Sequence, residues 1–277
     1  MILPIIAAIS RAIEIVIDKT ILSRQKVDFK VYLVGAFIPV LIIAVVLGLL
    51  FGEVRPAFFE WAYLLAFFGV IGTALGWNAI FYRAIQHEKL SEAEPIIIAT
   101  PIVTILISAI FMPEERKWGY VILGIIAVLS VIIARSYKHH LKFNRYSLAL
   151  VGYTLLFGFE ALFLKVVLTN CNAFALYPIR VAFLLAILAI IFRPSLKKTT
   201  IKNWLSFIGV GIVANAYHIL IYLSYDYYGI AVTALFTILQ PILVYFASIF
   251  LFKEKLDWRS IAAAAIVIAC VIYAQFI

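Results

Sequence analysis

Two carboxyl groups inside long apolar stretches are the residues best placed to do chemistry. Glu160 lies in the run YTLLFGFEALFLK, and Glu14 lies between Arg11 and Asp18 in the first apolar stretch of the chain. An ionisable side chain held away from water is costly, so it binds a substrate, carries a proton or pairs with an opposite charge. Glu160 therefore has two interpretations, a substrate or proton site and a structural ion pair with Arg180, and both could hold at once.

Arg11, Glu14 and Asp18 are separated by three and then four residues, which places them on one face of a helix. Such a face lines a cavity or pairs inside the protein, because three charges cannot face lipid. Glu14 is the strongest of the three candidates for substrate binding or proton coupling. Asp18 and the adjacent Lys19 stand nearer the end of the stretch, where their charged groups could reach the membrane surface.

A second group of polar residues recurs in both halves of the chain. Asn78 and Tyr82 are four residues apart. His218 and Tyr222 repeat this spacing, and Asn215 extends the second set by about one turn. We expect these side chains to line one shared cavity that binds the substrate. The alternative is that they form hydrogen bonds between helices, each worth about 0.6–2 kcal/mol in a membrane.

Two prolines also recur, at Thr100-Pro101 and at Gln240-Pro241. A proline inside a helix has no N–H to donate, so a main-chain carbonyl one turn earlier loses its partner. Broken helices at corresponding positions of two repeats point to the binding site of a transporter. We therefore predict that Thr100 and Gln240 contact the substrate and that Pro101 and Pro241 act as hinges. The alternative is a kink without a function.

The composition decides what kind of elements position these residues. Of the 277 residues, 66% are hydrophobic and 13% are charged, and the mean hydropathy is +1.11. A soluble protein is near 45–50% apolar and about 25% charged. This composition excludes a soluble enzyme, a nucleic-acid-binding module and a disordered chain. The two cysteines and four histidines form no metal-binding spacing, so we expect no metal and no cofactor.

Ten stretches are apolar over about the length that a membrane-spanning helix needs. The longest polar run, RSYKHHLKFNR (residues 135–145), lies near the middle of the chain. We therefore expect a basic linker at residues 136–146 between halves 1–135 and 147–277. We expect spans at residues 2–22, 31–51, 60–82, 92–112, 118–135, 147–168, 173–192, 203–225, 230–252 and 258–276.

The two halves are copies of one another. A shift of 140 residues superimposes the fourth and fifth stretches on the ninth and tenth, and a shift of 146 superimposes Glu14 on Glu160. Each copy has five spans, an odd number, so the second copy enters the membrane from the opposite side. This inverted repeat is a common transporter architecture, with the site at the repeat interface. The shift of 140 matches Pro101 with Pro241, Ser108 with Ser248, Glu114 with Glu254, and Trp118 with Trp258.

Two long segments carry a resemblance to a known family. They read PIIIATPIVTILISAIFMPEERKWGYVILGIIAVLSVII and LFTILQPILVYFASIFLFKEKLDWRSIAAAAIVIACVI. Each has a proline inside a span, a small residue seven positions later, an acidic residue after the span and a tryptophan that opens the next span. The pattern resembles the EamA-type members of the drug/metabolite transporter superfamily, as do Lys19, Lys165 and Arg180. The second span has no arginine that matches Arg180.

The resemblance implies an all-α integral membrane protein of ten transmembrane helices in two inverted five-helix repeats. It implies a secondary transporter of small organic metabolites or amphipathic compounds, working by alternating access. Efflux and proton coupling through Glu14 or Glu160 are the finer expectations, and a facilitator without coupling fits the sequence equally well. We expect a multi-pass protein of a prokaryotic inner membrane that functions as a monomer in the lipid bilayer and binds no nucleic acid.

Other classes remain as alternatives. A lipid flippase or a channel could use the same fold, and an intramembrane enzyme is disfavoured because no HExxH or GxSxG motif occurs. The sequence has no GxxxxGK[ST] motif, so ATP does not drive it directly. Most lysines and arginines lie in the odd-numbered connections, which places these connections in the cytoplasm and both termini outside.

Overall fold

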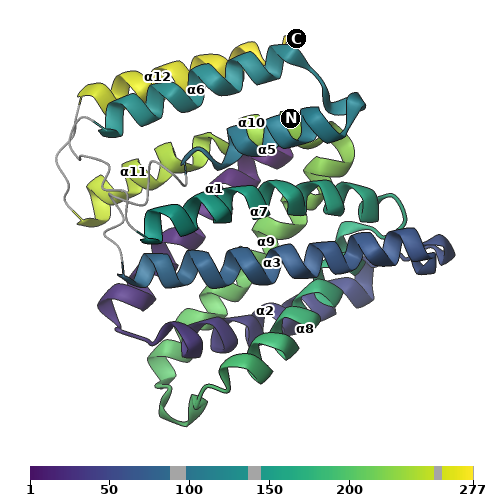
Figure 1. Cartoon of the computed structure of the whole chain (residues 1–277). Coiled ribbons are helices and arrows are strands. Elements are labelled where there is room, and N and C mark those ends of the chain that lie inside the picture. The colour runs from purple at the N-terminus through teal and green to yellow at the C-terminus, as the bar shows by residue number, and fades with distance from the viewer. Residues whose placement is uncertain (88–97, 137–144, 253–257, 277) are drawn as a thin grey trace.

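Helices make up nearly all of the structure, a computed structural model that describes residues 1–87, 98–136, 145–252 and 258–276 (Figure 1). The longer helices are α1 (Ile2–Lys19), α2 (Phe29–Phe51), α3 (Trp61–His87), α5 (Thr100–Phe111), α6 (Trp118–Ser136), α7 (Arg145–Leu168), α8 (Ala173–Phe192), α9 (Ile201–Tyr228), α10 (Ile230–Thr237), α11 (Leu239–Phe252) and α12 (Trp258–Tyr273). Short helical turns are η1 (Thr20–Arg24), η2 (Pro56–Phe59), η3 (Pro113–Glu115) and η4 (Leu196–Lys198).

The ninth expected span is not one helix, and this corrects the prediction of a continuous span over residues 230–252. It consists of α10 and α11, which are separated by a turn at Ile238. In the first half a turn at Ala99 directly precedes α5, and the earlier part of the fourth expected span lies outside the described residues. Each break lies two or three residues before a proline, Pro101 or Pro241, because a proline removes one N–H donor from the helix.

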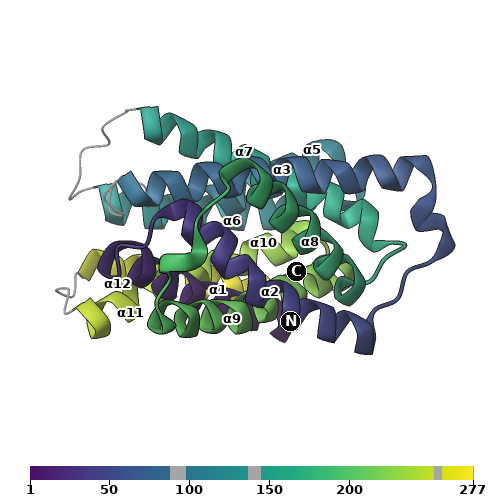
Figure 2. The ribbon, with the colours of Figure 1, turned by 90° about the horizontal axis from the view of Figure 1, so that it is seen from below.

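The packing of the helices repeats between the two halves. Helix α3 packs on α7 as α9 packs on α1, and α5 packs on α7 as α11 packs on α1. Helices α2 and α8 contact each other, as do α6 and α12. Figure 1 shows α6 and α12 side by side with opposite chain directions, and Figure 2 shows α3 and α7 in one layer above α1 and α9. The protein is therefore an all-α membrane protein built from two inverted five-helix halves.

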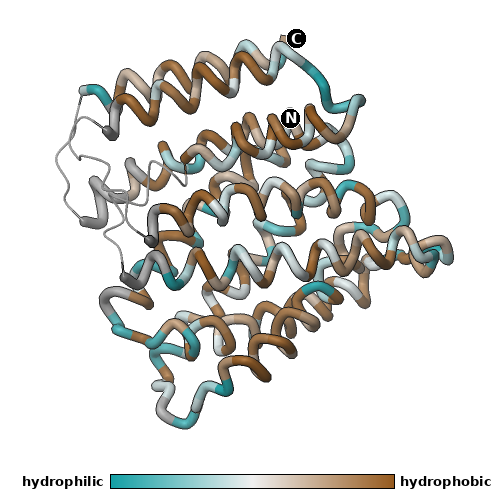
Figure 3. Tube along the Cα trace, in the orientation of Figure 1, coloured by the Kyte–Doolittle hydropathy of each residue, from teal (hydrophilic) through white to brown (hydrophobic). Residues whose placement is uncertain are grey.

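The surface and the helix lengths fit a bilayer. Within the described residues, five helices are long and apolar enough to cross it, namely the apolar parts of α2, α3, α7, α8 and α9. Large apolar side chains on the outside are strongly exposed, such as Leu49 (83%) and Ile133 (69%). Hydrophobic residues run along the helices in Figure 3, and hydrophilic ones gather at the connections. Lipid is the solvent that accepts such a surface.

Two connections at one end of the molecule pair with each other. The chain after α2 and the chain before α8 form an antiparallel bridge between Val54 and Cys171. Main-chain hydrogen bonds lie on both sides of the bridge, with N···O distances of 2.8 and 3.0 Å. The side chain of Asn172 adds a donated bond to the carbonyl of Phe51 at 2.9 Å. We call these paired segments the loop clasp (residues 51–55 and 169–172).

Glu115 fixes the start of α10 from the other half of the chain. It is 4% exposed, and its carboxylate accepts the N–H groups of Ile230 at 2.9 Å and Ala231 at 3.0 Å. Gly229 precedes them with φ +86°, and a Cβ there would lie 2.6 Å from Oε1 of Glu115. In the sequence, the internal repeat matched the neighbouring Glu114 with Glu254, but Glu114 is exposed in the structure. Glu115 is therefore a structural cap, because it satisfies N–H groups that the first turn of a helix leaves unpaired.

Replacement of Glu115 by alanine should destabilise the protein by about 2 kcal/mol, since two buried N–H groups lose their acceptors. The thermal unfolding midpoint in detergent measures this effect. Glu114→Ala is the matched control and should change the stability by less than about 0.5 kcal/mol, because Glu114 lies at the surface. Equal effects of the two substitutions would contradict the capping role.

Candidate functional site

A large cavity lies between the two halves. It contains about 890 Å³ of space not filled by protein atoms, part of which is open to the outside. Its walls come from α1, α3, α5, α7, α9, α10 and α11 and are mostly aromatic and aliphatic. Arg11 is the single charged side chain among the described lining residues. These are Arg11, Ile15, Phe81, Ile98, Thr100, Pro101, Thr104, Tyr153, Phe157, Tyr217, Ile221, Tyr225, Ala234, Thr237, Gln240, Pro241 and Val244.

The two mirrored proline segments meet at this large cavity. Thr100 and Pro101 line it from the first half, and Gln240 and Pro241 line it from the second. The helix breaks therefore lie at the cavity wall, where α5 packs against α10. The position of these four residues agrees with a role in binding and bending, which stays a prediction.

The polar residues of α3, α8 and α9 lie around two smaller cavities. A cavity of about 420 Å³ is lined by Glu14, Asn78, Tyr82, Arg180 and His218, together with Arg11. Another of about 260 Å³ is lined by Glu160, His218 and Tyr222 among others. The sequence predicted one shared cavity for this set, whereas the structure divides the set between neighbouring cavities. Arg11 lines both the large cavity and the cavity of about 420 Å³, so it lies between the residues of these two cavities.

Glu160 is held by three donors inside the protein. Arg180 donates to its Oε1 from Nη2 at 2.6 Å and from Nε at 2.8 Å. The indole N–H of Trp77 donates to the other oxygen, Oε2. Glu160 is 3% exposed and Arg180 is 2% exposed. The ion pair considered from the sequence is thus present, and Trp77 ties it to the first half, because α3 supplies the indole.

The two asparagines bond to main-chain carbonyls. Asn215 donates to the carbonyl of Val40 on α2 at 3.0 Å and to that of Gly211 at 2.7 Å. Asn78 donates to the carbonyl of Ala74 in its own helix at 2.8 Å. Asn215 lines none of the three cavities described above. Its contacts match the alternative of a hydrogen bond between helices, and a substrate contact by Asn215 has no support here.

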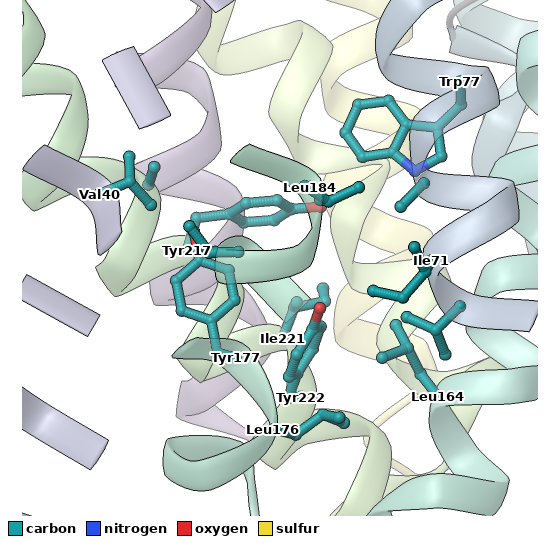
Figure 4. Packing of buried hydrophobic residues seen from close by; sticks show 14 of the residues in the cluster. Val40, Ile71, Trp77, Leu164, Leu176, Tyr177, Leu184, Tyr217, Ile221 and Tyr222 are labelled. Carbon is teal, nitrogen blue, oxygen red and sulfur yellow. The ribbon is translucent and has the colours of Figure 1, made fainter. Parts of the chain in front are cut away.

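Aromatic rings surround the charged groups. The ring of His218 stacks on Tyr177 with a centroid distance of 4.9 Å and lies 4.7 Å from Tyr217. The guanidinium of Arg11 lies over Tyr217 at 5.2 Å and over Phe81 at 5.7 Å. Figure 4 shows Trp77 of α3, Tyr177 of α8, and Tyr217 and Tyr222 of α9 as members of one buried cluster. Cation–π contact stabilises a buried guanidinium while leaving its edge available.

Two charged residues of α1, Arg11 and Asp18, have partners inside the protein that the sequence did not indicate. Arg11 pairs with Glu14, with 2.9 Å between Nη1 and Oε2, and both side chains are buried. Asp18 was expected near the membrane surface, but it is 1% exposed and accepts a hydrogen bond from the hydroxyl of Tyr32. This corrects the sequence interpretation of Asp18. Its spacing from Arg11 and Glu14 was the signal that could have placed it inside.

Lys165 is one of the residues that carried the family resemblance. It lies on α7, and its side chain caps the C-terminal end of α9. Its Nζ donates to the carbonyl of Tyr225 at 2.6 Å and to that of Asp226 at 3.2 Å. These carbonyls belong to the last turn of α9, where helical N–H groups run out. The carbonyl of Tyr225 also accepts the N–H of Gly229, whereas the N–H of Ile230, one turn after Asp226, goes to Glu115. A cation at the end of a helix is also favoured by the helix dipole. The structure thus gives Lys165 a capping role between α7 and α9.

The fold and the cavity together define the class of the protein. Two inverted five-helix halves, broken helices at matching positions and a central cavity at their interface are the architecture of a multi-pass membrane transporter. The family is shown by sequence: the model of the EamA-like transporter family matches residues 1–136 and again residues 144–274. The chain belongs to this family, whose members are secondary transporters of small metabolites and not enzymes.

Solved structures agree with this fold. One crystal structure superimposes with a TM-score of 0.75 over 96% of this chain and 96% of its own chain. The two sequences are 15% identical, so the likeness shows the fold alone. No curated protein matches the sequence.

Proposed function

We propose that the protein exports small amphipathic organic metabolites by alternating access, with the large cavity as the substrate site. The observation that carries this proposal is the cavity of about 890 Å³ between the halves, which both broken helices border. Aromatic and aliphatic walls bind the apolar body of a solute, and Arg11, Thr100 and Gln240 supply polar contacts to its head group.

Two features of the structure move in the proposed transport cycle: the helices that contain Pro101 and Pro241, and the loop clasp. Bending at Pro101 and Pro241 changes the cavity wall, because these prolines lie in the first turns of α5 and α11 and line the cavity. The loop clasp joins α2 and α8 at one end, so access from that end requires the clasp to separate. Coupling of transport to protons, for which the sequence offered Glu14 and Glu160, and the domain division 1–135, 136–146 and 147–277 are further parts of this proposal. Which residue binds the proton is a separate question.

The distribution of basic residues sets the orientation that we propose. Lys26 follows η1, Lys30 lies in the first turn of α2 and Arg193 follows α8, so all three stand at the ends of α2 and α8 that are opposite to the loop clasp. The positive-inside rule places that end in the cytoplasm and both termini outside. We propose a monomer in a prokaryotic inner membrane, because the two halves of one chain already complete the pseudo-symmetric unit.

Proteoliposomes loaded with a metabolite extract test the function. We expect selective loss of one or a few metabolites, measured by mass spectrometry, and no such loss from empty vesicles. Combined Arg11→Gln and Glu14→Gln substitutions remove a charged pair together and should lower the efflux rate about tenfold or more, since the cavity loses its cation. Arg83→Gln, an exposed arginine on α3, is the matched control.

Two outcomes would contradict the proposal. Folded protein that releases no metabolite selectively would remove the support for transport. Lipid scrambling or ion conductance in the same vesicles, without metabolite efflux, would favour the flippase or channel alternatives.

A further inference from the structure

The buried charges of the two halves are not balanced in the same way. In the second half one carboxylate, Glu160, faces one guanidinium, Arg180. In the first half one guanidinium, Arg11, shares a helix face with two carboxyl groups, Glu14 and Asp18. Arg11 pairs with Glu14 at 2.9 Å, so the second carboxyl group has no cation of its own among the described side chains. A buried and unpaired carboxylate is strongly disfavoured.

Asp18 has few partners for a charged group. It is 1% exposed, and its Oδ1 accepts a hydrogen bond from the hydroxyl of Tyr32. Its Oδ2 is buried and has no hydrogen-bond partner. An ionised carboxylate has two oxygens that together accept about four hydrogen bonds. One phenol donor is therefore far too little for an ion, whereas a neutral carboxylic acid needs fewer partners.

Asp18 forms no ion pair with a side chain that the structure describes. On α1, Glu14 stands one turn from Asp18 and disfavours a second negative charge, Arg11 is two turns away and is paired with Glu14, and the half-buried Lys19 is the next residue along the chain. Helix α3 contributes Tyr82, whose ring lies 5.3 Å from that of Tyr32. Helix α9 contributes the apolar Phe207, which packs on Tyr32, and α10 and α11 contain no charged residue.

A metal ion fits this position less well than a proton. Hard cations are held by several oxygen ligands. In the described part of the chain, no group of three or more His, Cys, Asp or Glu residues could hold a metal ion. The oxygen atoms that the described side chains bring toward Asp18 are the hydroxyl groups of Tyr32 and Tyr82 and the carboxyl group of Glu14. A proton bound to the carboxylate removes the charge with no further ligand.

We propose that Asp18 is the site that binds the transported proton in this protein. The proton comes from water when the cavity region is open, adds to the carboxylate of Asp18 as an O–H bond, and leaves to water on the other side. The proposal rests on the proposed transport function and assigns the coupling step to Asp18, where the sequence offered Glu14 and Glu160. Glu160 already has three donors, and Glu14 has Arg11.

Infrared spectroscopy of the protein in liposomes tests the proton without any substrate. We expect a C=O band of a buried protonated carboxyl near neutral pH. Asp18→Asn should abolish this band, and Asp226→Asn, an exposed aspartate after Tyr225, should leave it unchanged. Tyr32→Phe should shift the band to higher frequency, because the carboxyl loses a hydrogen bond, which assigns the band even if Asp18→Asn folds poorly. Absence of the band, or its survival in Asp18→Asn, would overturn the proposal.

Transport measurements test the coupling separately. With the metabolites that the efflux experiment identifies, a gradient of one pH unit and one proton per solute should drive about tenfold accumulation. Asp18→Asn should abolish this accumulation and keep solute exchange at equal pH. Gradient-driven accumulation by Asp18→Asn, or accumulation driven by sodium instead, would overturn the proposal. If the wild type moves no solute at all, the transport function fails, while the infrared result still decides whether Asp18 holds a proton.

Discussion

A disulfide between Val54→Cys and the native Cys171 is expected to stop transport, and reduction should restore it. These two positions face each other in the antiparallel bridge of the loop clasp. The hydrogen bonds flank the pair and do not join it, so it is a non-hydrogen-bonded pair, in which the Cα atoms are about 4.5 Å apart. This separation suits a disulfide. The flanking bonds run from Arg55 to Asn170 and from Asn172 to Glu53.

The expected loss is nearly complete, because alternating access needs the two halves to separate at this end in each cycle. A disulfide prevents that separation. The measurement compares metabolite efflux from oxidised and reduced proteoliposomes of Val54→Cys. The same variant with Cys171→Ser is the control and should respond to neither treatment. Undiminished efflux from fully cross-linked protein, with the disulfide verified by mass spectrometry, would show that the clasp stays closed during transport.

The native Cys171 also reports on the clasp. Burial raises the pKa of the Cys171 thiol to about 12, so only a very small fraction is the reactive thiolate near pH 8. Alkylation should therefore be slow while the clasp is closed. Conditions that populate the open state should accelerate it, since the thiol then meets water. The oxidation of Val54→Cys consequently needs a catalyst, and its rate should rise with pH.

The arrangement of the helices could be predicted from the sequence because the bilayer fixes the length of each element. Apolar stretches of about 20 residues give the spans, and the shift of 140 residues gives the inverted repeat. The break at Ile238 was missed as an element boundary, although Pro241 marked its neighbourhood. A proline predicts that a helix is interrupted nearby, but the residue at which the turn forms depends on packing against α5 and α9.

The site could be predicted only in part. The sequence identified which residues are polar inside the membrane, and Thr100, Gln240 and both prolines do line the large cavity. It could not tell which partner each residue would find, because a partner depends on helix rotation and depth. Asn215 donates a hydrogen bond to the carbonyl of Val40 on α2, and Asp18 is buried and accepts a hydrogen bond from Tyr32. Both outcomes were set by contacts between helices distant in sequence.

Loss of either charge from the Glu160–Arg180 pair is expected to destabilise the protein by about 3–5 kcal/mol. Arg180→Met would leave Glu160 with the indole of Trp77 as its one remaining donor among the described side chains, and Glu160→Gln would leave a buried guanidinium without an anion. Removal of both charges should recover most of the loss, because no uncompensated charge then remains. The double substitution is therefore expected to be more stable than either single one.

A double-mutant cycle distinguishes this ion pair from mere packing. Unfolding in detergent, followed by intrinsic fluorescence, gives the stability of the wild type, Arg180→Met, Glu160→Gln and the double variant. We expect a coupling energy above about 2 kcal/mol, since contacting residues in one network are not additive. Arg83→Met, at an exposed position, should change the stability little. Simple additivity would mean that Trp77 and the aromatic rings, and not the charges, hold α7 against α3 and α8. A large coupling energy would assign the contact between α7 and α8 to the charges.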